Sequence, residues 1–148
     1  YFPYTPSTNI LYGLDEALFM LLDEGLTNVF ERHRRLAYAT QLAVAGWGLE
    51  NLCVNPEEYS NSTTAVLMPE GHDADALRNI ILEKFNMSLG MGLGKVKGTV
   101  FRIGHIGDFN ELMMAGTLSG VEMGLSIARV PHTKGGVNAA LEFLASSA

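Results

Sequence analysis

The order of helical and strand-like periodicities along the chain is the feature that most restricts its fold. Apolar side chains recur at helical spacing in five segments, and strand-like runs occur in three. The helical segments are residues 11–25, 28–46, 73–86, 108–125 and 135–145, and the strand-like runs are residues 49–56, 62–69 and 98–104. Strands and helices do not alternate continuously in this order, which argues against a long parallel sheet. We therefore expect an α+β domain with a small, mainly antiparallel sheet covered by helices on one face.

Glycine, proline and polar residues mark the expected ends of these segments. Residues 1–9 should be extended because they contain two prolines. Gly25 should end the first helix, and Thr27 should cap the second. Asp108 should cap the fourth, with Glu111 three residues on, close to a capping box. The expected apolar faces are Leu14, Leu18, Leu21 and Leu22; Val29, His33, Leu36, Thr40, Ala43 and Trp47; Leu77, Ile80, Ile81 and Phe85; and Met114, Leu118, Val121 and Leu125.

Length, charge and cysteine content narrow the classes of function. A chain of 148 residues suits one domain. Its net charge is −6 and it has no basic run, so we expect no nucleic-acid partner. No apolar stretch is as long as a transmembrane helix, so we expect no membrane partner. The single Cys53 fits a reducing compartment, and neither a secretion signal nor a peroxisomal ending is visible, so we expect a cytoplasmic location.

The chain opens on Y-F-P-Y-T-P-S-T-N, which does not begin with Met and is rich in prolines and aromatic residues. This opening indicates an excised part of a longer protein. We expect residues 1–24 to form an interdomain segment and the start of a long helix. Residues 25–148 should form the small domain itself.

Arg102 interrupts an otherwise apolar strand and is the first candidate for a binding residue. Strand side chains alternate between faces, so Phe101 and Ile103 should face one side and Val100, Arg102 and Gly104 the other. Gly104 should leave open space beside the guanidinium, whose planar fork matches a carboxylate with two parallel hydrogen bonds. The alternative is a structural arginine that pairs with an acid or faces water.

The other candidate residues show less evidence of a binding or catalytic role. His105, at the strand end, is interpreted as a structural histidine, and His33, among three arginines, as a solvated surface residue. No two His or Cys residues have the spacing of metal ligands, so we expect no metal site. The Gly90–Gly94 loop lacks the Walker spacing and a following helix, so it should be a flexible loop beside a site. The hydroxyls and the amide near the N-terminus either bind a phosphate or order the loop; they belong to Thr5, Ser7, Thr8 and Asn9.

Several motifs together resemble the C-terminal part of serine–glyoxylate aminotransferases. The specific ones are Y-F-P-Y-T-P-S-T-N and F-R-I-G-H-I-G-D; N-V-F-E-R-H-R-R-L-A, F-N-M-S-L-G-M-G-L-G and L-S-G-V-E-M-G-L extend the similarity along the chain. These enzymes are class V, pyridoxal-phosphate-dependent aminotransferases of fold type I. The resemblance implies the small C-terminal domain of that fold, and an activity that moves the amino group of L-serine to glyoxylate, giving hydroxypyruvate and glycine.

The resemblance also implies roles for individual residues. Arg102 would bind the α-carboxylate of the amino acid and of the 2-oxo acid. Thr5, and less securely Tyr1, would bind the phosphate of pyridoxal 5'-phosphate in the neighbouring subunit of a homodimer, with a tetramer as a further possibility. The lysine that forms a Schiff base lies upstream in this family, so Lys95 and Lys97 should not take that role. We expect no catalytic residue in this chain and no catalysis by it alone.

Two alternatives remain open at the level of the sequence. The amino donor could be aspartate or alanine on the same scaffold, since donor selectivity lies mostly in upstream residues of the family. The chain could also be a non-catalytic carboxylate-binding module that kept the arginine and lost the cofactor-binding domain.

Overall fold

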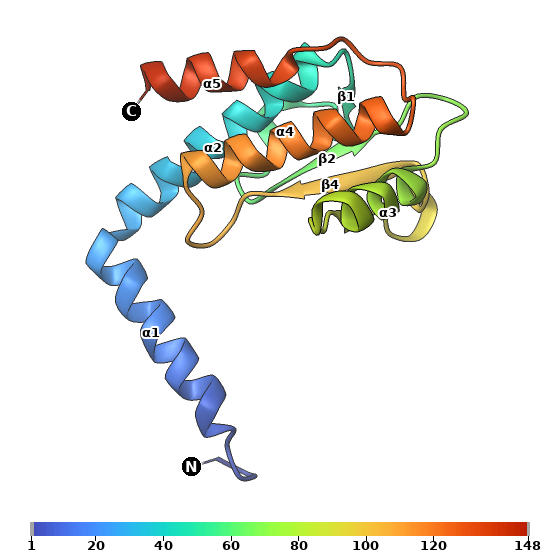
Figure 1. The fold of residues 1–148 in the computed structure, drawn as a ribbon. Helices are drawn as coiled ribbons and strands as arrows, with labels where there is room; N and C mark the ends of the chain where they lie inside the picture. Colours follow the sequence, from blue (N-terminus) through green and yellow to red (C-terminus); the bar gives the residue numbers. More distant parts are fainter. Residues whose placement is uncertain (1, 148) are drawn as a thin grey trace. The chain divides into compact units, whose positions relative to one another are not determined.

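Five helices and four strands make up the fold of residues 2–147, the part that the computed structural model describes (Figure 1). The helices are α1 (Thr8–Glu24), α2 (Leu26–Gly46), α3 (Ala74–Phe85), α4 (Glu111–Ile127) and α5 (Gly136–Ser146). The strands are β1 (Glu50–Asn51), β2 (Thr63–Leu67), β3 (Gly90–Met91) and β4 (Val100–Gly104). Short 3₁₀ turns occupy Pro56–Glu58 and Gly94–Val96.

The chain divides into two units, residues 1–32 and residues 33–148. In the first unit, α1 contains no buried residue, and Leu14, Leu18 and Leu22 of its apolar face are exposed. The second unit contains the sheet and α3 to α5. This division falls inside α2, whereas the boundary expected between residues 24 and 25 remains a prediction.

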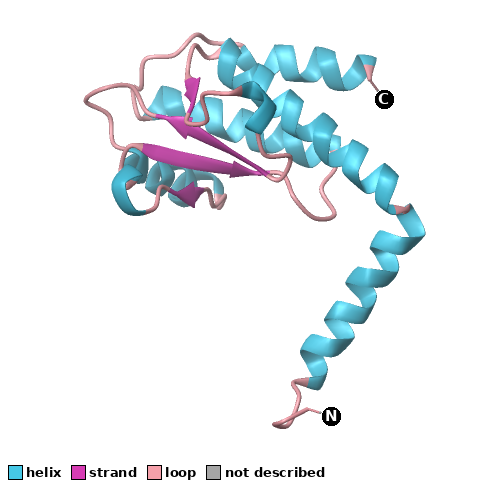
Figure 2. Ribbon diagram, turned by 180° about the vertical axis from the view of Figure 1, so that it is seen from behind, coloured by secondary structure: helices cyan, strands magenta, loops and turns pink. Residues whose placement is uncertain are grey.

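The four strands form one sheet in the order β1-β2-β4-β3, and all three pairings are antiparallel (Figure 2). In the central pair, Val66 lies opposite Phe101, and Ala65 lies opposite Arg102. On the other side of β4, Gly90 lies opposite Arg102. The expectation of a small antiparallel sheet in an α+β domain is therefore confirmed.

The core lies between one face of the sheet and the helices of the second unit. Val66, Phe101 and Ile103 are completely buried on this face. The helical residues packed with them are Leu36, Ala39, Ala43 and Val44 of α2, Leu77 and Ile81 of α3, Met114, Leu118, Val121 and Leu125 of α4, and Ala140 and Leu144 of α5, together with Trp47 directly after α2. The predicted apolar faces of α2, α3 and α4 supply most of this list, so their helical periodicity was a sound guide to the core.

Helix α5 lies close to the end of α2 because glycines meet there. A Cβ atom on Gly46 would lie 2.8 Å from the Cα of Gly136, and a Cβ atom on Gly136 would lie 2.4 Å from the Trp47 ring. The Glu122 carboxylate stabilises the same junction between α2 and α5. It accepts hydrogen bonds from Trp47 Nε1 at 2.8 Å and from the Gly135 backbone N–H at 2.7 Å.

Some expected helix ends were wrong. Helix α1 begins at Thr8, so residues 8 and 9 are not extended. Thr27 lies inside α2 and does not cap it, because Val29 N–H already bonds to the Gly25 carbonyl. Asp108 does not cap α4 either; Asn110 does, with Oδ1 accepting from Met113 N–H at 2.9 Å. Gly25 does end α1 with a positive φ of 84°, as expected.

Two features of the sheet also differ from the expectation. The first strand is limited to Glu50–Asn51, and a strand that was not expected, β3, lies in the glycine-rich segment. A strand of two residues has no measurable period, so apolar alternation could not reveal it. It forms only because the neighbouring β4 offers unpaired backbone groups along its free edge.

Candidate functional site

Arg102 lies in the middle of β4 on the face of the sheet that points away from Phe101 and Ile103. Its neighbours across the two adjoining strands are Ala65 on β2 and Gly90 on β3. Both are among the smallest residues, so they leave space for the half-buried guanidinium. A long, charged side chain can therefore lie along this face of the sheet.

The guanidinium is held from one side by β3. Arg102 Nε donates a hydrogen bond to the Met91 carbonyl oxygen at 3.0 Å. A Cβ atom on Gly90 would lie 3.1 Å from Nε and 3.5 Å from Cζ, so the planar group covers the bare side of this glycine. Within the described residues, Arg102 has no ion pair with an acid. Its two terminal nitrogens can thus receive an external carboxylate.

Gly104 leaves open space, as the sequence predicted, but the guanidinium of Arg102 does not lie against it. A Cβ atom at Gly104 would meet nothing within 4 Å. The close neighbour is Gly90, in the segment expected to be a flexible loop beside a site. The alternation of glycines in that segment was a signal for close backbone approach, although spacing alone could not name Gly90 as the contact.

His105 directly follows this strand and is fully buried. Its Nδ1 lies 3.1 Å from the Asn61 carbonyl oxygen, so Nδ1–H donates, and Nε2 accepts from the Thr64 hydroxyl at 3.0 Å. Burial lowers the pKa of His105 to about 4, although the Asn61 carbonyl opposes this change. A neutral, doubly hydrogen-bonded imidazole supports the interpretation of His105 as a structural residue.

His33 is not the solvated surface residue that the arginines around it suggested. It is half-buried, and its Nε2 accepts a hydrogen bond from the Gly107 backbone N–H at 3.0 Å. The bond joins α2 to the loop after Arg102. Contact between residues this far apart in the chain leaves no pattern in the sequence.

The N-terminal candidates lie in the first unit, whereas Arg102 lies in the second. Thr5 is exposed, and Tyr1 lies outside the described residues. Ser7 is the N-cap of α1, but its side chain makes no capping hydrogen bond. The hydroxyls of Thr5 and Ser7, together with the first N–H groups of α1, are groups that can bind an anion.

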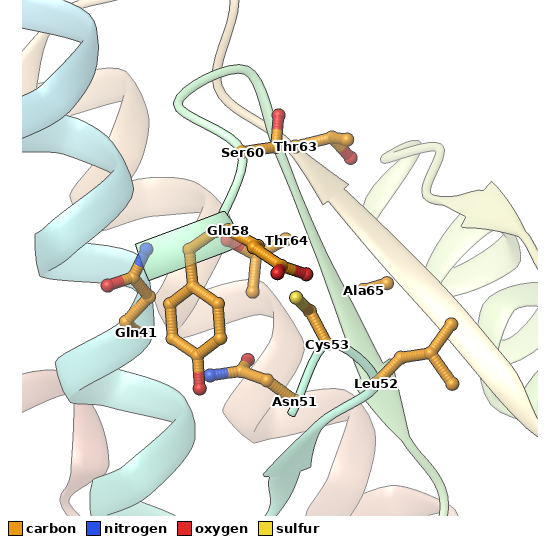
Figure 3. Close-up of a pocket in the computed structure, with 10 residues that line it drawn as sticks. Gln41, Asn51, Leu52, Cys53, Glu58, Ser60, Thr63, Thr64 and Ala65 are labelled. Atoms are coloured by element: carbon orange, nitrogen blue, oxygen red, sulfur yellow. The ribbon is translucent and has the colours of Figure 1, made fainter. Parts of the chain in front are cut away.

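A cavity of about 250 Å³ lies beside β1 and β2 (Figure 3). It is lined by Gln41, Asn51, Leu52, Cys53, Glu58, Tyr59, Ser60, Thr63, Thr64 and Ala65. Asn51 Oδ1 is buried there without a hydrogen-bond partner among the described residues. Its one charged side chain is the Glu58 carboxylate, which would repel an acid. Arg102, rather than this cavity, is therefore the better candidate for carboxylate binding.

Two further findings concern the described residues as a whole. None of their His, Cys, Asp and Glu side chains form a group of three or more placed to hold a metal ion. Among the described helices, none is both long and apolar enough to cross a membrane. Lys95 and Lys97 are exposed around the 3₁₀ turn that follows β3.

Comparison with curated proteins shows strong similarity along nearly the whole chain. It is 50% identical to serine–glyoxylate aminotransferase of Methylorubrum extorquens and 49% identical to that of Arabidopsis thaliana, in each case over 97% of this chain and 36% of the relative. It is 42% identical to L-aspartate–glyoxylate aminotransferase of Paracoccus denitrificans, over 95% of this chain and 36% of that protein. The chain thus spans about a third of the length of these relatives. No protein-family model matches it.

Solved structures show the same fold. Pyridoxamine–pyruvate aminotransferase from Mesorhizobium loti superposes with a TM-score of 0.93 at 32% identity, over 100% of this chain and 38% of that one. Ureidoglycine–glyoxylate aminotransferase from Bacillus subtilis superposes with a TM-score of 0.88 at 28% identity, over 95% of this chain and 36% of that one. The matched parts are the C-terminal portions of these aminotransferases.

Proposed function

We propose a transaminase function from one premise: this chain is homologous along nearly its whole length to the C-terminal part of the serine–glyoxylate aminotransferases. In this proposal it is the C-terminal domain of an enzyme that transfers the amino group of L-serine to glyoxylate. The products are hydroxypyruvate and glycine. The observation that carries the proposal is the position of Arg102, whose terminal nitrogens are open on a face of the sheet with small neighbours.

Arg102 would bind both substrates in turn by the group that they share. Serine and glyoxylate each carry a carboxylate next to the carbon that reacts. A charge-assisted contact to such a carboxylate contributes roughly 1.5–3 kcal/mol. Because the carboxylate is held at two points, rotation of the substrate is restricted and the reacting carbon is oriented. The same arginine therefore serves both halves of the transfer.

The proposal implies pyridoxal 5'-phosphate, which serves as an electron sink for the reacting carbon when it is bound. The residues present suit its phosphate, since the Thr5 hydroxyl is exposed and the Ser7 hydroxyl makes no capping bond at the start of α1. Thr5, together with Tyr1, would hold the phosphate from a neighbouring subunit. The lysine that carries the cofactor would belong to the part of the protein upstream of this chain.

A homodimer is part of this proposal, and a tetramer built from such dimers is its extension. Apolar side chains exposed on α1 support an association, because isolated apolar faces of this size are uncommon on free surfaces. They include Ile10, Tyr12, Leu14, Leu18, Phe19 and Leu22. A cytoplasmic location also stays a proposal, supported by the free thiol of Cys53.

Aspartate as the amino donor is the second candidate, because an aspartate–glyoxylate enzyme is 42% identical to this chain. Alanine as donor and a non-catalytic carboxylate-binding module are weaker alternatives. Arg102 does not discriminate between them, since all of these ligands carry a carboxylate.

An absorbance titration of the full-length protein separates these candidates. L-Serine, L-aspartate and L-alanine are added separately, without any oxo acid, and the visible cofactor band is followed. Loss of the band at the lowest concentration with serine supports the serine–glyoxylate activity. The same result with aspartate or alanine keeps the transaminase and changes the donor. A protein with no cofactor band at all would contradict the transaminase function.

A further inference from the structure

We infer that β3 and Arg78 form a support that fixes the orientation of Arg102, so that only its terminal Nη1–Nη2 edge is presented to a carboxylate. This inference rests on the proposed carboxylate-binding role of Arg102 and adds positioning residues to it. The support is defined as Gly90 and Met91 of β3 together with Arg78 of α3, which bonds to the Leu89 carbonyl oxygen directly before β3. None of these residues needs to touch the substrate.

Met91 determines which edge of the guanidinium remains open. A guanidinium can meet a carboxylate with its Nε–Nη edge or with its two terminal nitrogens. In this protein, Nε already donates to the Met91 carbonyl oxygen at 3.0 Å. The Nε–Nη edge is therefore occupied, and a carboxylate must approach end-on, along the direction of the side chain.

Gly90 determines the height of the guanidinium above the sheet. It lies opposite Arg102 in the register, and an added Cβ atom would lie 3.0 Å from Arg102 Cβ and 3.1 Å from Nε. Gly90 does not have a positive φ, so alanine fits its backbone conformation. A substitution would thus press on the arginine side chain, and because Arg102 Cβ moves only with its backbone, β3 and β4 would also have to separate slightly.

Arg78 of α3 bonds to the backbone directly before the edge strand β3. Its Nε donates to the Leu89 carbonyl oxygen at 2.8 Å, and its Nη1 donates to Asp75 Oδ1 at 2.8 Å. At the other end of the glycine-rich segment, Ala74 N–H donates to the Gly98 carbonyl oxygen at 2.8 Å. Helix α3 therefore holds both ends of the segment that carries Met91.

Gly92 lies directly after the support, at a position that has no room for a side chain. A Cβ atom there would lie 2.1 Å from the Val96 carbonyl oxygen and 3.0 Å from the Val100 carbonyl oxygen. Directly after Met91, the Gly92 backbone comes close to the backbone of Val96, four residues further on. A two-residue strand, which would be weak alone, is thus held by the Arg78 bond to Leu89 directly before it and by close backbone packing at Gly92 directly after it.

A double-mutant cycle on the full-length protein tests the inference. We expect Gly90→Ala to raise KM for both the amino donor and glyoxylate about tenfold, with kcat changed less than threefold and the cofactor band unchanged. In an Arg102→Lys background, where the planar fork is already lost, Gly90→Ala should raise KM less than twofold. Arg78→Leu should raise KM severalfold and show the same dependence on Arg102.

Gly116→Ala is the matched control, because a Cβ atom at Gly116 on α4 would meet nothing within 4 Å. It should leave KM unchanged, and the thermal midpoints of all variants show whether they fold. Equal effects of Gly90→Ala in both backgrounds, or no effect in the wild type, would overturn the inference that β3 and Arg78 orient Arg102. If Arg102→Lys and Arg102→Ala themselves leave KM unchanged, the carboxylate-binding role fails instead, so the two failures are distinguishable.

Discussion

Trp47 donates its indole N–H to Glu122 Oε2 at 2.8 Å, which ties the end of α2 to the middle of α4. The other oxygen of the same carboxylate accepts from the Gly135 N–H at 2.7 Å, and Oε2 also accepts from the Val137 N–H at 3.2 Å. The half-buried Glu122 carboxylate therefore accepts hydrogen bonds both from the Trp47 side chain and from backbone N–H groups at the start of α5. This residue is the centre of the junction between three helices.

Glu122→Ala should lower the free energy of unfolding by roughly 2–3 kcal/mol, because it leaves the Trp47 N–H and the N–H groups at the start of α5 without partners. Unfolding in urea, followed by the fluorescence of the single tryptophan, measures the change. Glu142→Ala, at an exposed position of α5, is the control and should change stability by less than about 0.5 kcal/mol. Equal stability of the two variants would contradict the role of Glu122.

Glu122 should also make the free energy of unfolding depend on pH in the acidic range. Burial raises the pKa of this carboxyl, but the hydrogen bonds from Gly135, Trp47 and Val137 outweigh it, and the net pKa is below the ordinary value of 4.5. The native state therefore releases the proton more readily than the unfolded state. The stabilisation is complete above pH 4.5 and is lost as the pH falls through the folded pKa. Glu122→Gln should remove this part of the pH dependence.

His105 should give a second pH dependence, at higher pH. The unfolded chain takes up a proton near pH 6.5, whereas the native state resists protonation until about pH 4. Between these values the unfolded state binds more protons, so stability falls as the pH drops from 6.5 to 4. A loss of up to about 3 kcal/mol follows from such a difference in pKa. Chemical denaturation at a series of pH values measures the loss, and His105→Gln should flatten the curve while His72→Gln should leave it unchanged.

In the proposed function, Arg102→Ala should raise KM for both proposed substrates of the full-length protein roughly 10- to 100-fold, since a charge-assisted pair of hydrogen bonds would be lost. The thermal midpoint should change little, because the side chain is half-buried and makes one hydrogen bond within the described residues. Steady-state kinetics with serine and glyoxylate varied in turn measures the effect. Unchanged KM values for both substrates would rule out the role of Arg102.

In the proposed function, Thr5→Val should raise the dissociation constant of pyridoxal 5'-phosphate about fivefold to tenfold, since a hydrogen bond from the hydroxyl to the charged phosphate would be lost. Equilibrium dialysis of the full-length protein measures that constant. Thr27→Val, at an exposed position in α2, is the matched control. The same cofactor affinity in both variants would argue against Thr5.

Apolar periodicity alone predicted the helices of the second unit, the central strands and the strand position of Arg102. The buried residues Leu36, Leu77, Leu118 and Phe101 lie on faces that the periodicity predicted, because burial of apolar surface imposes the helical or strand period on the sequence. The open position at Gly104 was predictable for the same reason.

Contacts between residues far apart in the chain could not be predicted in this way and became visible in the folded protein. The contact of Gly90 with Arg102, the hydrogen bond of His33 to Gly107 and the pairing of Trp47 with Glu122 leave no local pattern. The two-residue β3 exists because β4 has a free edge for it to pair with, and Asn110 caps α4 in place of Asp108 because the chain becomes helical only after it. Such choices depend on the packing of whole elements, and no stretch of neighbouring residues contains that information.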